Sequence, residues 1–233
     1  MARNYEATRF RSARFDGQLV LAGARGERRL RSLKGLFKLV DGGAMARLMR
    51  FSAPADLNGA ATLTIERPQG TDDLWLYLPA MRRVRRLVSA NKRDAWVGSE
   101  FSLGDITGHK VADWRYTITG ETAVGGAAAT VVNCLPATRG VASDTGYSRR
   151  VCWISRANGL MLQMDCYDLT GALSKRQTIG DVQTFANAPG KAQPMRAVMQ
   201  NLQTNAVTTF TLSNFVANGP IGDGDVAPSA LAG

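Results

Sequence analysis

Residues 73–88 read DLWLYLPAMRRVRRLV, and this stretch decides the fold class. Large apolar residues continue as far as Leu78, in a run too short to cross a bilayer but of the length of a β-strand. Pro79 stops the run, and Ala80-Met81 can form the tip of a tight hairpin. Four arginines interleaved with apolar residues follow the tip. The stretch therefore predicts a β-hairpin whose second strand is strongly basic.

Most of the remaining chain shows the same alternation of apolar strands and turn residues. In residues 61–65, for example, the apolar Ala61, Leu63 and Ile65 alternate with threonines, which gives the strand one apolar face. Strands are predicted at residues 30–40, 44–51, 60–67, 73–78, 83–88, 113–121, 130–135, 147–155, 160–167, 173–185, 194–202 and 207–216. Short turns at such regular spacing favour an antiparallel meander, so the predicted fold class is mainly β.

Residues 91–110 interrupt this pattern. Trp96, Phe101, Leu103 and Ile106 recur roughly at helical spacing, but glycines break the series. We expect a short helix or an irregular lid, which must lie against something apolar because so many large apolar side chains are costly in water. Residues 218–233 are rich in glycine and proline and are predicted to form a loose C-terminal tail, which leaves residues 1–217 as a single domain.

The turns predict which strand residues face each other. A turn centred near Gly70 sets Ile65 opposite Trp75. A turn at residues 80–81 sets Trp75 opposite Arg86. A curved meander can close partly into a barrel with a ligand cavity, and this register places one apolar set on its concave surface. The set is Leu63, Ile65, Trp75, Tyr77 and Val84. A slip by one residue would present the intervening leucines instead, and a solid core is the alternative to a cavity.

The net charge of +10 leaves several interpretations open. Arginines cluster at residues 25–31, 82–86 and 149–150. Such clusters can contact anionic lipid headgroups, an acidic partner or nucleic acid, or they can simply form solvated strand faces. The chain has no zinc-ligand spacing, helix-turn-helix pattern or aromatic RNA-binding motif, which argues against nucleic acid. We expect the hairpin arginines to dock to a partner or a headgroup and to reach water or a carboxylate, with Arg86 closest to the cavity mouth. They are Arg82, Arg83, Arg85 and Arg86.

The three cysteines do not form a metal-binding pattern, since none stands in a Cys-x-x-Cys pair and the chain has one histidine. Cys134 and Cys152 flank a polar turn centred near Ser143. Strands paired around that turn would bring the two sulfurs opposite each other, which makes them the disulfide candidate and leaves Cys166 free. The alternative is three buried thiols that pack as small apolar residues.

No pattern of catalytic residues is visible. His109, the only histidine, lies in a predicted loop. Gly98-Ser-Glu-Phe-Ser102 is not a nucleophile elbow, and Gly125-Gly126 lacks the rest of a phosphate-binding loop. We therefore predict that the protein is not an enzyme and has no metal site and no cofactor.

Motifs spread over residues 45–215 resemble a known family. Residues 50–59, RFSAPADLNG, are similar to its turn RF-x-x-P-x-D-x-x-G, and the basic hairpin follows. The lid stretch at residues 91–105, the strand at residues 147–154 and the turn at residues 165–171 continue in the family's order. In these motifs the chain resembles the periplasmic outer membrane lipoprotein-sorting proteins, which are related in fold to the carrier LolA and its receptor LolB.

The resemblance implies a half-barrel of about eleven strands whose concave apolar face is covered by helices. It also implies carriage of a lipid or acyl chain through the periplasm, with transient membrane contact and an inner-membrane transporter of the RND type as partner. The candidate lipid-binding residues are then the sheet set together with Trp96, Phe101, Leu103 and Ile106. Residues 4–15 are short and arginine-rich, so the N-terminal helical cover is expected to be reduced.

Two further expectations remain open. The first ten residues have no apolar centre of a signal peptide, so a periplasmic protein would have lost its signal, and a cytosolic protein is the alternative. For function, the alternatives to a carrier are an interaction module that docks through the arginine-rich hairpin and a small hydrolase of unrecognised type. The sequence does not distinguish lipoprotein acyl chains, hopanoid- or sterol-like lipids and other envelope lipids as cargo.

Overall fold

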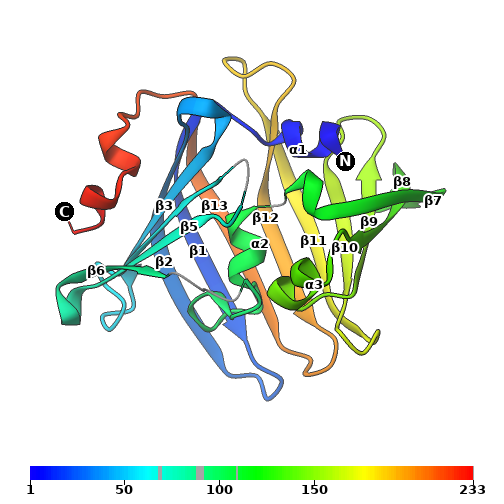
Figure 1. The fold of residues 1–233 in the computed structure, drawn as a ribbon, viewed down its shortest axis with the longest axis horizontal. Helices are drawn as coiled ribbons and strands as arrows, with labels where there is room; N and C mark the ends of the chain where they lie inside the picture. Colours follow the sequence, from blue (N-terminus) through cyan, green and yellow to red (C-terminus); the bar gives the residue numbers. More distant parts are fainter. Residues whose placement is uncertain (68–69, 88–91, 109, 233) are drawn as a thin grey trace. The chain divides into compact units, whose positions relative to one another are not determined.

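The computed structural model describes residues 1–67, 70–87, 92–108 and 110–232 and shows a mainly β chain (Figure 1). The strands are β1 (Ser12–Ala22), β2 (Arg28–Leu39), β3 (Met45–Ala53), β4 (Ala61–Ile65), β5 (Asp73–Leu78), β6 (Arg83–Leu87), β7 (Trp114–Val124), β8 (Ala127–Pro136), β9 (Arg149–Ser155), β10 (Met161–Tyr167), β11 (Leu173–Thr184), β12 (Ala192–Asn201) and β13 (Val207–Ala217). The helices are α1 (Ala2–Ala7), α2 (Leu103–Thr107) and α3 (Arg139–Thr145). Short 3₁₀ turns are Asp41–Gly43, Pro79–Met81, Trp96–Gly98, Val111–Asp113, Gly224–Val226 and Pro228–Leu231.

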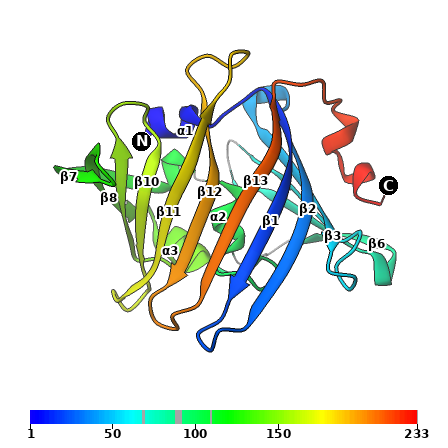
Figure 2. The ribbon, with the colours of Figure 1, turned by 180° about the vertical axis from the view of Figure 1, so that it is seen from behind.

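These strands form one open antiparallel sheet. Over the described residues it is thirteen strands wide, in the order β6-β5-β4-β3-β2-β1-β13-β12-β11-β10-β9-β8-β7. Most sequence neighbours are neighbours in the sheet, as expected of a meander. The exceptions are β6 and β7, which are consecutive in the sequence but form the two edges of the sheet. Strand β1 lies between β2 and β13, and Figure 2 shows these three strands side by side. The predicted mainly β, antiparallel fold is confirmed, with more strands than the eleven or so that the resemblance implied.

Strand β1 is the element that the sequence analysis missed. We expected a short arginine-rich cover at residues 4–15, but α1 ends at Ala7 and β1 begins at Ser12. Within β1 the side chains of Ala13, Phe15 and Leu19 are buried, whereas Arg14 is exposed. The arginine thus belongs to the solvent side of a strand with period-two burial, and counting charges concealed this alternation.

The described residues form two compact units. The lid unit, named for residues 91–110, comprises Met1–Arg9, Leu21–Arg28 and Asn91–Phe210. The hairpin unit, named for β5 and β6, comprises Phe10–Val20, Arg29–Ala90 and Thr211–Gly233. The expectation of one domain over residues 1–217 stays a prediction.

The hairpin unit buries apolar side chains on both faces of its strands. On one face, the rings of Phe10, Phe15, Phe37 and Phe215 pack together, with centroids 5.4 to 6.3 Å apart. Gly35 lies directly beside the Phe15 ring, so that any β-carbon at this position would overlap the ring. On the other face, Leu48 and Leu63 are paired in register and buried. Glycine at position 35 therefore allows the aromatic group to close.

One apolar core of the lid unit lies around strands β7 to β10. The buried residues are Trp114, Val132, Cys134, Tyr147, Cys152, Met164 and Cys166. Helix α3 stands where we expected only a polar turn near Ser143. The Thr138 hydroxyl caps its first turn by accepting a hydrogen bond from the Val141 amide, and Gly146 ends it with a left-handed backbone.

Candidate functional site: an apolar sheet surface and an anchored lid segment

The strand register assembles the predicted apolar set on one face of the hairpin unit. Leu63 lies opposite Trp75, and Tyr77 lies opposite Val84. Leu63 is fully buried, Ile65, Trp75 and Tyr77 are half-buried, and Val84 is exposed. Because side chains of one face recur every second residue, Ile65 belongs to the same face as Leu63.

One of the two predicted turns gave the observed register and the other did not. The β5–β6 hairpin places Trp75 opposite Arg86, as predicted. In the β4–β5 pair, Ile65 lies opposite Asp73 rather than Trp75. The difference is two residues, which preserves the face and therefore the membership of the set.

The chain's own C-terminal residues cover this apolar face, which we had not expected. Val226 and Leu231 are buried in one cluster with Leu48 and Leu63, and Trp75 and Tyr77 pack at its edge. Through these two side chains the described end of the chain, residues 218–232, packs against the strands, whereas its composition suggested a loose tail. Composition concealed this because the apolar anchors are few and stand between glycines and prolines.

The turn at residues 50–59 packs against the tip of the basic hairpin. Gly59 has a left-handed backbone, and a β-carbon at this position would approach a Pro79 ring carbon to 3.1 Å. The Arg50 guanidinium donates a hydrogen bond of 3.4 Å to the Gly59 carbonyl. The two stretches that carried the resemblance in sequence are therefore in contact in the hairpin unit.

The hairpin arginines divide into two groups. Arg82, Arg83 and Arg85 are exposed, and the neighbouring Met81 at the tip is 59% exposed. Arg86 instead forms an ion pair with the buried Asp73. The Arg86 guanidinium also lies 5.7 Å from the centre of the Trp75 ring, which is within cation–π range.

Asp73 holds a second guanidinium, because Arg67 Nε donates to Asp73 Oδ2 over 2.7 Å. Burial raises the pKa of the Asp73 carboxyl, but the hydrogen bonds from Arg86 and Arg67 outweigh burial and leave the pKa below its ordinary value. The carboxylate is therefore ionised at neutral pH, and the three groups together carry a net positive charge.

Within the lid unit, the large apolar residues of residues 91–110 pack on β13. Trp96 and Phe101 are 1% and 2% exposed, and their ring centroids lie 5.8 and 6.5 Å from that of Phe210. Leu103 and Ile106 are half-buried in α2. The structure thus brings the lid residues together in one unit and the sheet residues together in the other. Asn91 and His109 lie outside the described residues.

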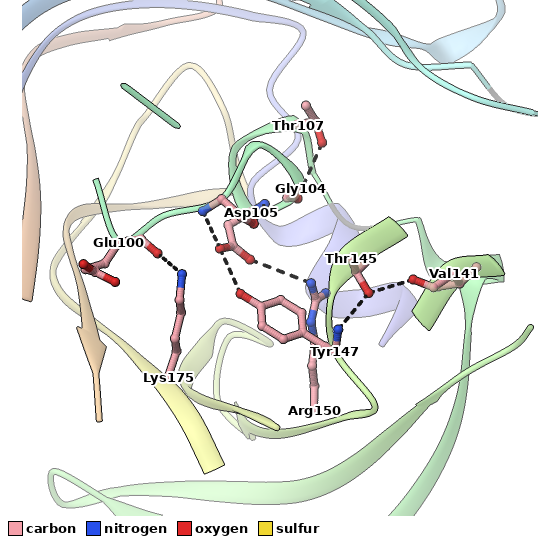
Figure 3. A network of polar contacts seen from close by, with 10 residues as sticks. Glu100, Gly104, Asp105, Thr107, Val141, Thr145, Tyr147, Arg150 and Lys175 are labelled. Atoms are coloured by element: carbon pink, nitrogen blue, oxygen red, sulfur yellow. Dashed lines mark hydrogen bonds and ion pairs between the residues drawn. The ribbon is translucent and has the colours of Figure 1, made fainter. Parts of the chain in front are cut away.

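A polar network anchors the lid segment at the start of α2 (Figure 3). Ser102 and Asp105 form a reciprocal cap, in which each side chain accepts a hydrogen bond from the other residue's amide. The Asp105 carboxylate also faces Arg150 Nη2 at 3.7 Å and Tyr147 Oη at 3.4 Å. The Arg150 guanidinium is buried between aromatic rings, 4.4 Å from the centre of Trp114.

A second anchor lies at Glu100. Lys175 Nζ donates to the Glu100 carbonyl over 2.5 Å, and the Glu100 amide donates to Thr208 Oγ1 over 2.9 Å. Sequence reasoning missed both anchors. It grouped Arg150 with the surface arginines, although Arg150 and Cys152 fall on the same face of β9 and Cys152 has an apolar side chain.

The two cysteines proposed as a pair are neighbours in the lid unit, and the structure holds them as thiols. Their sulfurs lie 3.8 Å apart. Cys152 is opposite Val132 rather than opposite Cys134, so the contact is diagonal across β8 and β9. The contact lowers the pKa of Cys134 and raises that of Cys152, and burial raises the pKa of Cys166 to about 12. The disulfide stays a prediction, which alkylation of the denatured, unreduced protein tests.

Two negative findings concern the described residues alone. None of their helices is long and apolar enough to span a membrane. Among them, no group of three or more His, Cys, Asp or Glu residues could hold a metal ion. His109 lies outside them, so its predicted lack of a catalytic role stays a prediction.

Comparison with known proteins identifies the family. A family model described only as an uncharacterized protein matches residues 43–232. The chain belongs to this family. None of the curated proteins matches it.

Two solved structures are similar to this chain over nearly its whole length. One is a domain from Vibrio parahaemolyticus that is provisionally described as an outer membrane lipoprotein-sorting protein domain; it is 26% identical, with a TM-score of 0.88, and the match covers 99% of this chain and 94% of that chain. The other is a DUF1329 family protein from Desulfovibrio piger, at 25% identity and a TM-score of 0.90, with 99% and 95% covered.

A LolA superfamily protein from Nitrosomonas europaea shares the fold. It is 19% identical, with a TM-score of 0.72, and the match covers 97% of this chain and 94% of that chain. At this identity the similarity concerns the fold alone. Together, the three matches confirm the LolA-like fold and the resemblance drawn from the sequence motifs.

Proposed function

We propose that this protein is a periplasmic carrier that binds a lipid or a lipoprotein acyl chain and passes it between components of the envelope. The observation that carries the proposal is the similarity, over 99% of the chain, to a domain provisionally described as lipoprotein-sorting. The apolar set on β4 and β5 and the apolar lid segment support it, because an acyl chain can bury its methylenes against large apolar side chains of this kind.

The binding chemistry requires no covalent step. Transfer of an acyl chain from water to an apolar site contributes about 0.8 kcal/mol per methylene, so a dozen buried methylenes contribute about 10 kcal/mol. That amount can offset extraction from a bilayer. The proposal is therefore a non-enzymatic carrier that needs no cofactor and no metal.

The lid segment is the proposed gate. Trp96, Phe101, Leu103 and Ile106 would contact cargo after the segment moves away from β13. Such a movement would have to break the contact of Asp105 with Arg150 and the contacts of Glu100 with Lys175 and Thr208. These anchors keep the gate shut in the absence of cargo and make its opening a discrete event.

The basic hairpin is the proposed docking element. The exposed Arg82, Arg83 and Arg85 suit transient contact with an anionic membrane surface or with the acidic part of a transporter of the RND type. Arg86 differs from them, since its pairing with Asp73 beside Trp75 suits contact with a cargo headgroup.

Mass spectrometry of organic extracts tests the carrier proposal most directly. The protein is purified from its native envelope without detergent, and the extract is compared with that of an unrelated periplasmic protein of similar charge prepared in parallel. Stoichiometric enrichment of one lipid class supports the carrier function and names its cargo, whether lipoprotein acyl chains, hopanoid- or sterol-like lipids or other lipids. An extract indistinguishable from the control would contradict it.

The second candidate function is a non-enzymatic interaction module of the envelope. One observation favours it: the hairpin tip exposes the apolar side chain of Met81 beside the exposed Arg82, Arg83 and Arg85. An interaction module would keep its partner binding after the apolar set is made polar, for example in Trp75→Gln. A carrier would lose its lipid in the same variant.

A further inference from the structure

The C-terminal segment, residues 221–231, is attached to the hairpin unit in an unusual way. It consists of two short 3₁₀ turns, shown in red in Figure 1, and contributes no strand to the sheet. Its apolar contact rests on Val226 and Leu231, which are 2% and 0% exposed. The segment therefore covers the sheet face by side-chain contact and not by strand pairing.

Polar side chains of β2 and β3 hold this segment. Arg50 donates to the carbonyls of Ala230 and Leu231 over 2.6 and 3.1 Å, and Lys38 Nζ lies 2.6 Å from Asp223 Oδ1. The chain leaves β13 at Asn218, whose amide donates to the Ser12 carbonyl and fixes the point of departure. Glycines at positions 219, 222 and 224 follow. The segment can thus swing away from this fixed point without breaking any strand ladder.

The surface beneath the segment is apolar along one row of paired residues. Leu48, Leu63 and Trp75 lie opposite one another across β3, β4 and β5. The indole N–H of Trp75 is buried and has no acceptor among the residues that the structure describes. It is therefore a hydrogen-bond donor that a polar ligand group could use.

A cationic group lies at one end of this surface. Asp73 precedes Trp75 on the same face of β5, and its carboxylate pairs with both Arg67 and Arg86. Each of these arginine side chains is 54% exposed, so both can still bind a further anion. Two guanidinium groups on one carboxylate leave a positive charge next to an apolar row, which matches an amphiphile with an anionic head.

We propose that residues 221–231 are a displaceable cover over a binding site for an anionic single-chain amphiphile, whose acyl chain lies on Leu48, Leu63 and Trp75 and whose head binds Arg67 and Arg86. This inference rests on the proposed carrier function. The cover shields the apolar row when no ligand is present, and ligand and cover compete for it. Only molecules whose cover is open can bind the ligand. The apparent affinity is therefore the intrinsic affinity multiplied by the fraction of molecules with an open cover.

The first test weakens the cover and measures binding. A long-chain fatty acid with a fluorophore is titrated into wild-type protein and into the Val226→Ser/Leu231→Ser variant. We expect the variant to bind at least about tenfold more tightly, because its cover is open more often. The matched control is Val132→Ser/Leu160→Ser, which alters an equally buried Val and Leu in the lid unit and should not raise the affinity. Equal affinity of wild type and cover variant would overturn the inference.

The second test identifies the head site. In the cover variant, Arg67→Gln/Arg86→Gln should weaken binding of the fatty acid by about tenfold and leave the matched fatty alcohol unchanged, because only the acid carries a charge. An equal loss for both probes would assign the arginines to folding and contradict the proposed head site.

The third test uses wild-type protein alone, so it does not depend on how the variants fold. Amide hydrogen exchange of residues 221–231 should accelerate when the fatty acid is added, since the ligand displaces the cover. Unchanged exchange at saturating probe overturns the cover even if the protein carries lipid elsewhere. If wild type and every variant bind no probe and native extracts contain no lipid, the carrier function itself fails.

Discussion

At the scale of single residues, burial separates arginines that the sequence presents as equivalent. Arg149 and Arg150 are adjacent in the sequence, yet Arg150 is 5% exposed and faces Asp105 from inside the lid unit. Charge counting suggested a surface cluster. The alternation of β9 assigns Arg150 to the same face as Cys152, and only the structure shows that this face is buried.

Removing this guanidinium should destabilise the lid unit. Arg150→Met leaves the Asp105 carboxylate buried without its cation, and breaking a buried pair in this way costs about 3 kcal/mol or more. Urea unfolding measures the loss. The control is Arg156→Met, because the Arg156–Glu121 pair is exposed and contributes less than about 1 kcal/mol. If the two variants lose equal stability, Arg150 does not anchor the lid.

Asp73 gives the hairpin unit a pH-dependent contribution to stability. Its pKa is lowered in the folded state, so the contribution is fully present above the unfolded pKa, near 3.8, and is lost as the pH falls through the folded value. We expect the difference in unfolding free energy between wild type and Asp73→Asn to be constant from neutral pH down to about 5 and to shrink below about 4. Urea titrations at a series of pH values measure this difference. A difference that grows on acidification would mean that the arginines do not stabilise the carboxylate.

At the scale of elements, the tight hairpin was predictable and the longer connections were less so. A two-residue turn at residues 80–81 permits only one strand register, and for this reason the pairing of Trp75 with Arg86 was predicted correctly. The longer connection around Gly70 is compatible with several strand registers. The predicted partner of Ile65 was therefore wrong by two residues, Trp75 in place of Asp73. The residues were still assigned to the correct face of the sheet, because a register shift of two residues leaves every side chain on its own face.

Two elements without strong apolar periodicity were not predicted from the sequence, for different reasons. Strand β1 carries charged residues on its exposed side, which obscured its buried Phe15 and Leu19. The C-terminal cover is glycine-rich and depends on Val226 and Leu231 meeting strands more than 150 residues earlier. Local sequence patterns contain no information on such distant contacts. The membership of the apolar set on one sheet face was recoverable from alternation, whereas its role in binding lipid stays a proposal.

The packing of β2 against β1 gives an element-scale prediction. In Gly35→Ala the new methyl would overlap the Phe15 ring, which packs against the rings of Phe37 and Phe215. Overpacking of this kind costs about 1 to 3 kcal/mol, measured by thermal or urea unfolding. Gly120→Ala is the matched control, because a β-carbon there meets no atom within 4 Å in strand β7. If both alanines are tolerated equally, the aromatic group is looser than described.

At the scale of the whole molecule, the positive charge is concentrated in clusters of arginines. The net charge is +10, and its arginine clusters include residues 25–31 as well as the hairpin. Arg25, Arg28 and Arg29 are exposed, as are Arg82, Arg83 and Arg85. Net charge alone would attract the protein to any anionic surface through either group of three arginines. Docking through the hairpin instead requires that its three arginines contribute more to the binding free energy than the three at residues 25–29.

We therefore predict that Arg82→Gln/Arg83→Gln/Arg85→Gln abolishes most binding to vesicles of anionic phospholipid, with a loss of about 1 kcal/mol per arginine at low salt. Vesicle sedimentation measures the bound fraction, and vesicles of zwitterionic lipid give the baseline. The effect should diminish towards high salt, because exposed charges are screened beyond about 10 Å at 0.1 M. Circular dichroism should be unchanged, since these side chains are solvent-exposed.

The control with equal charge decides between docking and bulk attraction. Arg25→Gln/Arg28→Gln/Arg29→Gln also removes three positive charges, but from the β1–β2 connection and the start of β2. Docking through the hairpin requires that this variant keep most of its vesicle binding, because Met81 and the three tip arginines remain together. Equal losses in the two triple variants would show that the whole charge of the protein acts, and the hairpin would then be an ordinary solvated strand pair.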